Sequence, residues 1–129
     1  NVTSIFHLSL KQSLINHQVR FPGFHNFIHL ELIFGRFMNW HLMLEMLKHC
    51  PKLQTFVPRF LPVEGYSREV WYCPEYVPEC ISSQLRKCTV LNYKDTVCEL
   101  LFVKYILLNS RALQTMTIHN STASALLIP

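Results

Sequence analysis

The sequence predicts an α/β fold: an open solenoid in which about five short parallel strands form one sheet and helices cover its convex side. Three observations lead to this prediction. One pattern of apolar residues, at positions i, i+3 and i+5, recurs along the chain. Helical patterns lie between its copies, and a strand–helix–strand order favours neighbouring parallel strands with right-handed crossovers. Finally, a chain of 129 residues, half of them hydrophobic, is long enough for one domain with a substantial core.

The repeated pattern starts at residues 5, 27, 53, 85 and 113, so its steps are 22, 26, 32 and 28 residues. A period of roughly 20–29 residues with an L-x-x-L-x-L core is typical of leucine-rich repeats. One step is longer, and we expect it to hold an insertion. The predicted core positions are Ile5, Leu8 and Leu10; Phe27, Leu30 and Leu32; Leu53 and Phe56; Leu85, Cys88 and Val90; Leu113, Met116 and Ile118. In the third copy Pro58 takes the last place of the pattern.

Local patterns place the elements between these positions. We expect strands over residues 2–10, 27–33, 53–57, 87–93 and 113–118. We expect a helix over residues 40–49, because Trp40, Met43, Leu44 and Leu47 fall on one stripe and Asn39 is a suitable N-cap. Pro78 in a first helical turn predicts a short helix through residues 80–83.

The longest helix is expected from Thr96 to Asn109. Thr96 and Glu99 have the spacing of a capping box, in which each side chain satisfies the free backbone N–H of the other residue. The run from Leu100 to Leu108 is apolar nearly all round, apart from Lys104 in its middle. We therefore expect neighbouring elements to cover most sides of this helix.

The expected insertion covers residues 58–83, where proline and aromatic residues are frequent. Its prolines exclude a long helix. We expect Trp71, Tyr72 and Tyr76 to fold back and cap the sheet edge or a helix end. A peptide-binding aromatic cluster is the alternative.

Composition argues against several functions. The net charge of +4 is spread without a basic run, so we expect no nucleic-acid partner. No apolar window reaches the roughly 18 residues of a membrane-spanning helix, so we expect no membrane partner. The five cysteines form no C-x-x-C pair. They indicate no metal or cofactor and a reduced intracellular compartment, the nucleus or cytoplasm. Pairing or metal binding by Cys73 and Cys80 is the alternative.

Catalysis is not expected. The chain has seven histidines, but none belongs to a recognisable Ser-His-Asp or Cys-His motif. Only three glycines are present, and they form no phosphate-binding loop. The sequence therefore predicts no catalytic residues.

The second half of the chain resembles the FBD domain, a module at the C-terminal end of many plant F-box/leucine-rich-repeat proteins. The residues that carry the resemblance are Trp71, Pro74, Val77–Cys80, Leu85, Val90, Glu99–Leu100, Tyr105–Asn109 and Leu113–Ile118. The segment with Trp40, Leu44, Leu47 and Cys50–Leu53 resembles the last repeat before that domain. The resemblance assigns residues 1–62 to a leucine-rich-repeat segment and residues 63–129 to an FBD domain that continues the same sheet.

Two departures from the family pattern affect the expected fold. The family commonly has a glycine between the fourth strand and the last helix, whereas this chain has Tyr93–Thr96, so we expect a different turn. Pro58 replaces an aliphatic residue, so we expect the third strand to end early.

The resemblance implies a non-catalytic protein-interaction module, the C-terminal part of a substrate-recognition subunit of a cullin–RING ubiquitin ligase. In such proteins an N-terminal F-box binds the ligase adaptor and the repeats hold the target. No F-box lies in this sequence, so we expect a fragment that binds an unknown protein target and reaches the adaptor only through the missing F-box. A truncated standalone scaffold without a ligase role is the alternative.

Candidate partner contacts follow from strand alternation. In a curved parallel sheet, the residues between the buried ones face the open concave side. An ordinary solvated sheet face has the same mixed polar character, and this is the alternative. The candidate contacts are His7, Ser9, His29, Glu31, Thr55, Lys87, Thr89, Thr117 and His119.

Overall fold

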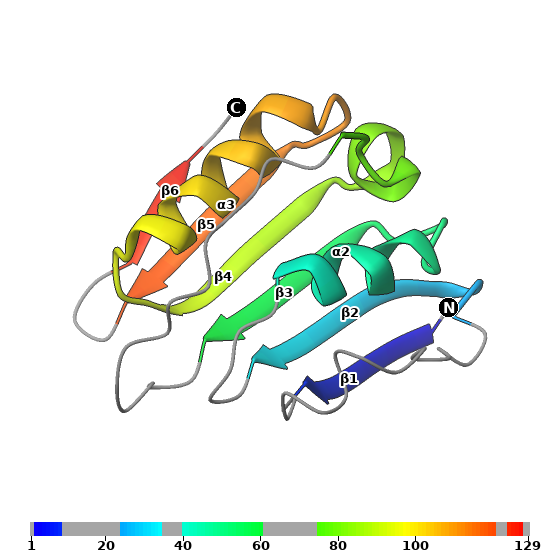
Figure 1. Ribbon diagram of the computed structural model, residues 1–129, viewed down its shortest axis with the longest axis horizontal. Coiled ribbons are helices and arrows are strands. Elements are labelled where there is room, and N and C mark those ends of the chain that lie inside the picture. Colours follow the sequence, from blue (N-terminus) through cyan, green and yellow to red (C-terminus); the bar gives the residue numbers. More distant parts are fainter. Residues whose placement is uncertain (1, 9–23, 35–39, 61–74, 121–123, 128–129) are drawn as a thin grey trace.

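The computed structural model describes residues 2–8, 24–34, 40–60, 75–120 and 124–127. Its strands are β1 (Val2–Leu8), β2 (Phe27–Phe34), β3 (Thr55–Phe60), β4 (Lys87–Tyr93), β5 (Thr115–Asn120) and β6 (Ser124–Leu127). Its helices are α2 (Trp40–Lys48), α3 (Val97–Asn109) and the short π-helix η1 (Cys80–Gln84). The strands form one sheet in sequence order, and α2 and α3 lie on the same face of it (Figure 1).

The sheet is open and mostly parallel, which confirms the predicted fold class. Strands β1 to β5 pair with their neighbours in parallel. The additional strand β6 pairs with β5 in the antiparallel direction. It lies outside the repeat pattern, and it places an antiparallel strand on the last edge of the parallel sheet.

Four copies of the predicted repeat pattern are confirmed by the strand register. Leu30 pairs with Phe56, Phe56 with Cys88 and Cys88 with Met116, at the predicted spacings of 26, 32 and 28 residues. All four side chains are fully buried. Because identical positions of successive repeats stack on neighbouring strands, one row of apolar side chains runs across the helical side of the sheet.

The predicted alignment of the first copy is wrong. β1 pairs Ser4 with Leu30 and Leu8 with Phe34, so the first step is 26 residues instead of 22. The similarity between His7–Leu10 and His29–Leu32 suggested the other alignment. A shift by four residues leaves every side chain on the same face of a strand, so alternation alone does not distinguish the two registers.

The expectation that β3 ends before Pro58 is also wrong. β3 continues to Phe60, and Pro58 pairs in register with Leu32 of β2. Pairing between β3 and β4 lapses after Phe56 and resumes in the same register at Arg59 and Leu91. A proline removes one N–H donor from the ladder. The strand continues because the residues on both sides of Pro58 still pair with the neighbouring strands.

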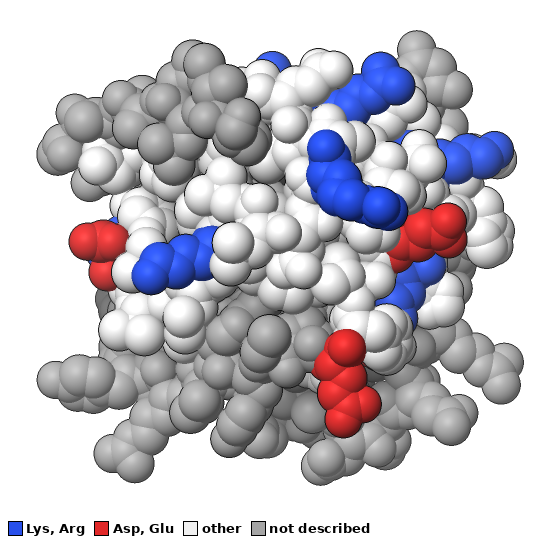
Figure 2. Space-filling view, turned by 90° about the horizontal axis from the view of Figure 1, so that it is seen from above, with Lys and Arg blue, Asp and Glu red and all other residues white. Residues whose placement is uncertain are grey.

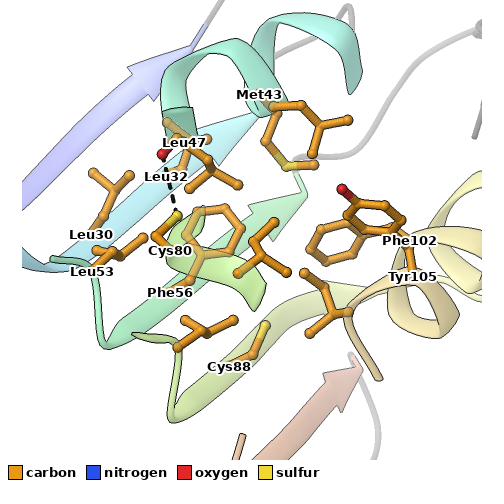
Figure 3. Packing of buried hydrophobic residues seen from close by; sticks show 14 of the residues in the cluster. Leu30, Leu32, Met43, Leu47, Leu53, Phe56, Cys80, Cys88, Phe102 and Tyr105 are labelled. Carbon is orange, nitrogen blue, oxygen red and sulfur yellow. Dashed lines mark hydrogen bonds between the residues drawn. The ribbon is translucent and has the colours of Figure 1, made fainter. Parts of the chain in front are cut away.

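The core lies between the sheet and the helices. Phe56 of β3, Cys88 of β4, Met43 and Leu47 of α2 and Phe102 of α3 belong to one buried cluster, and Figure 3 shows Phe56 between Leu47 and Cys88. The stripe predicted for the first helix is confirmed, since its residues Trp40, Met43, Leu44 and Leu47 are all buried. The helix α3 is less covered than expected: one side of it is exposed at Val97 (74%), Leu100 (40%) and Leu108 (82%).

Where the family pattern has a glycine, this chain has two residues at positive φ. Asn92 (59°) lies inside β4, where the pairing with β5 shifts register, and Asp95 (60°) lies in the turn from β4 to α3. Asn and Asp tolerate this left-handed conformation better than other non-glycine residues. The Asn92 side-chain amide also donates to the carbonyl of Phe60 on β3. After this turn the predicted capping box is present, with Thr96 as N-cap and Glu99 as its partner.

Replacing Asp95 with valine is expected to lower the free energy of unfolding by about 1–2 kcal/mol, because a β-branched side chain is strained at positive φ. Asp95→Gly serves as the control, since glycine adopts this conformation without strain. Urea unfolding followed by circular dichroism measures both. Equal losses for the two variants would mean that the conformation of residue 95 does not limit stability.

Parts of the predicted insertion are described. The short helix after Pro78 is confirmed as η1, and Pro78 accepts hydrogen bonds from the N–H groups of Ile81 and Ser82. The ring of Tyr76 lies beneath the ammonium group of Lys48, 4.2 Å from ring centroid to Nζ, at the end of α2. Tyr76 therefore caps a helix end as expected. Trp71, Tyr72 and Cys73 lie outside the described residues.

Candidate functional site: the open face of the sheet

The sheet face opposite the helices is formed by the residues that alternate with the buried core positions. We call it the open face and define it by three rows across the strands. The first row contains His29, Thr55, Lys87 and Thr115. The second contains Glu31 beside Val57, and Thr89 beside Thr117; the third contains Ile33, Arg59 and Leu91. Each row brings together residues that are far apart in the sequence, which is what a continuous binding surface needs.

The predicted contact residues fall at different places in these rows. His29, Thr55 and Lys87 are neighbours in the first row, and Glu31, Thr89 and Thr117 lie in the second. His119 follows at the end of β5, opposite Ser124 of β6. His7 pairs with Ile33 and not with His29, because the register of β1 differs from the predicted one. Ser9 lies outside the described residues.

The chemistry of the open face is polar in its first row and mixed further along. His29 Nε2 lies 3.7 Å from Glu31 Oε1, a contact that is an ion pair only when the imidazole is protonated, and each side chain is about one third exposed. Lys87 and Arg59 are exposed, and the threonines are half-buried. Val57 is buried at 7% exposure although it lies on this face. Hydrogen-bond donors and cations thus outnumber carboxylates among the described residues of this face.

Sequence reasoning missed the third row. Arg59 was not predicted as a contact, because β3 was expected to stop before it. The signal was present in the sequence, since the alternation of polar Arg59 and apolar Phe60 continues beyond Pro58. Ile33, Leu91 and Thr115 lie inside predicted strands but were not among the predicted contacts.

Three of the four cysteines in the described part of the chain are buried in the core. Cys50, Cys80 and Cys88 are buried free thiols. The Cys80 Sγ donates to the carbonyl of Leu47, 3.2 Å away, which joins η1 to the end of α2 (Figure 3). Burial raises the pKa of Cys50 and of Cys80 to about 12 and raises the pKa of Cys88 as well. These thiols are thus protonated and inaccessible in the folded chain.

We expect iodoacetamide at pH 8 to leave Cys50, Cys80 and Cys88 unmodified in the folded chain and to modify all three in urea. Peptide mass spectrometry reads each site separately, and partly exposed Cys98 serves as the internal control. Modification of the three buried thiols as fast as Cys98 would show that the core opens readily.

The raised thiol pKa values also make the free energy of unfolding depend on pH. Their contribution to stability is fully present below pH 9, the ordinary thiol pKa, and is lost as the pH rises toward 12.

In the described part of the chain, no group of three or more His, Cys, Asp or Glu side chains is placed to hold a metal ion. Within the same residues, no helix has the length and apolar character to cross a membrane. On the face shown in Figure 2, lysine and arginine side chains lie singly or in small groups, and acidic side chains lie beside some of them.

Comparison with known proteins supports the resemblance seen in the sequence. Residues 74–118 match the family described as FBD. Two Arabidopsis thaliana proteins named as FBD-associated F-box proteins are 34% and 33% identical over 59% and 85% of this chain. An Arabidopsis protein named as an F-box/FBD/LRR-repeat protein is 34% identical over 91% of the chain. The resemblance to plant F-box/FBD proteins is therefore confirmed.

The chain is much shorter than these relatives. It spans 19%, 26% and 28% of their lengths. No solved structure matches it. The similarity thus concerns the part of each relative that aligns with this chain.

Proposed function

We propose that this chain is a non-catalytic target-binding part of a substrate receptor in a cullin–RING ubiquitin ligase, and that its open face contacts the target. The observation that carries the proposal is the surface built from neighbouring strands, where His29, Thr55, Lys87 and Thr115 stand side by side on the face without helices. Concave surfaces of stacked strand repeats are well suited to hold another protein.

The names of the relatives support the ligase context. They combine an F-box with the FBD region or with leucine-rich repeats. In the proposed division of labour, an F-box elsewhere in a longer protein binds the ligase adaptor. This chain then binds the target and orients it. Such a role requires a stable surface and no reacting group.

The proposal is tested in a full-length receptor that carries an F-box. We expect the double variant His29→Ala, Glu31→Ala to lose most of the co-purifying target while it retains the ligase adaptor. These two side chains lie on the open face, are about one third exposed and do not belong to the core. Their removal therefore alters the surface and leaves the core intact. Truncating a hot-spot residue at the centre of an interface costs about 2 kcal/mol or more, which is a loss of roughly thirtyfold in affinity.

A matched control uses the helical side of the molecule. His41 and Glu45 lie on α2, where His41 is exposed and Glu45 is half-buried. The variant His41→Ala, Glu45→Ala removes the same two residue types and should retain the target. Unchanged target capture by the His29/Glu31 variant would refute the open face as the contact surface.

A further inference from the structure

The first row of the open face continues into a group of cations at the edge where strands β3 and β4 begin. Lys87 is the first residue of β4, and Arg86 precedes it. The N–H groups of Arg86 and Lys87 both donate to the carbonyl of Gln54, 2.8 and 3.0 Å away, which fixes them beside the start of β3. Lys52 lies two residues before Gln54 in the same turn. The side chains of Lys52, Arg86 and Lys87 are all exposed.

Few carboxylates lie near these cations in the described part of the chain. Strands β3, β4 and β5 contain no Asp or Glu. Glu31 belongs to the second row on β2, where its Oε1 lies 3.7 Å from His29 Nε2. Glu75 and Glu79 precede η1, which contacts α2 and α3. Among the described residues, the edge of the open face at Lys52, Arg86 and Lys87 is therefore locally positive.

Hydroxyl groups complete the chemistry of this edge. Thr55 and Thr115 flank Lys87 on the two neighbouring strands, in direct register. A carboxylate prefers charged N–H donors and accepts hydroxyl hydrogen bonds as well. Neighbouring strands are about 4.8 Å apart, so a chain that crosses them meets one donor on each strand.

We propose that this edge of the open face binds an acidic segment of the target polypeptide, which crosses β3, β4 and β5 with its carboxylates against Lys52, Arg86 and Lys87. The inference rests on the proposed function and adds the chemistry of the partner. A protein segment suits this edge better than a nucleic acid, because its described residues Lys52, Thr55, Arg86, Lys87 and Thr115 include three cations and no aromatic side chain that would stack on a base.

The inference is tested on the chain itself with a fluorescent twelve-residue peptide of alternating Glu and Ser. A peptide of alternating Lys and Ser and a single-stranded DNA of twelve nucleotides serve as comparison probes. We expect fluorescence anisotropy to show binding of the Glu peptide that weakens as salt is added. Preference for the Lys peptide, or tighter binding of the DNA, would overturn the inference.

Two charge-matched variants locate the binding. Arg86→Gln, Lys87→Gln removes two cations from the edge, and Lys94→Gln, Lys104→Gln removes two exposed cations from the β4–α3 turn and from α3. We expect the first variant to bind the Glu peptide about tenfold more weakly and the second to bind it normally. Equal weakening in both variants would show a general charge effect and overturn the inference. Urea midpoints of both variants establish that they remain folded.

The same variants separate this inference from the proposed function. If the full-length receptor with Arg86→Gln and Lys87→Gln captures its target normally, while the His29/Glu31 variant does not, the acidic segment is excluded and the open face stands. If neither variant affects capture, the open face itself is refuted.

Discussion

Replacing Phe102 with alanine is expected to lower the free energy of unfolding by about 3–5 kcal/mol, a large fraction of the stability of a small domain. Phe102 of α3 is fully buried. Its ring lies 5.4 Å from that of Trp40 on α2 and 6.3 Å from those of Phe56 and Phe60 on β3. Removal of this ring leaves a cavity where both helices and the sheet meet, so the cost combines lost burial with lost aromatic contacts.

The control is Leu108→Ala on the same helix. Leu108 is 82% exposed, so its truncation should change the free energy of unfolding by less than about 0.5 kcal/mol. Urea unfolding followed by circular dichroism measures both variants. A loss for Phe102→Ala as small as that for Leu108→Ala would contradict the described packing of α3 on the sheet.

Phe102 and Leu108 also show which part of the packing of α3 could not be predicted from the sequence. Both belong to one apolar run. Lys104 in that run marks the exposed side, because Leu100 and Leu108 lie four residues before and after it, whereas Phe102 lies on the opposite side. The run does not identify the residues that cover Phe102. Coverage depends on which elements flank α3. Its partners α2 and β3 lie far away in the sequence, and their approach follows from the sheet register.

Spacing predicted register well where the repeats carried a unique apolar pattern, as at Leu30, Phe56, Cys88 and Met116. It failed at β1, because a shift by an even number of residues preserves alternation, so alternation alone does not select the register. The extent of β3 was mispredicted for another reason. A single proline costs one ladder bond, and flanking pairs outweigh that cost.

The open face was only partly predictable. Alternation assigned His29, Glu31 and Lys87 to one face, since strand geometry fixes this locally. Which of these residues become neighbours depends on crossovers of different lengths. The position of Arg86 beside the start of β3 follows from backbone hydrogen bonds to Gln54, which no local pattern specifies.

Replacing Glu99 with alanine is expected to lower the free energy of unfolding by about 2–4 kcal/mol, more than the loss of an ordinary N-cap. Glu99 is a buried carboxylate, only 2% exposed. Its Oε1 accepts from the N–H of Thr96 at 3.0 Å, and its two oxygens accept from the N–H of Lys94 at 3.3 and 3.2 Å. The side chain thus holds both ends of the turn that contains Asp95 at positive φ, and its removal leaves two backbone donors without their acceptor.

Two further variants separate the acceptor role of Glu99 from helix capping in general. Glu99→Gln keeps one acceptor oxygen and nearly the same shape, so it should lose less stability than Glu99→Ala. Thr96→Ala removes only the reciprocal bond to the N–H of Glu99 and should cost about 1 kcal/mol. Because the turn connects β4 to α3, hydrogen exchange of the Lys94 and Thr96 amides should accelerate most in Glu99→Ala. If Glu99→Ala and Thr96→Ala cost the same, the bonds to Lys94 contribute nothing, and the turn is held by the capping box alone.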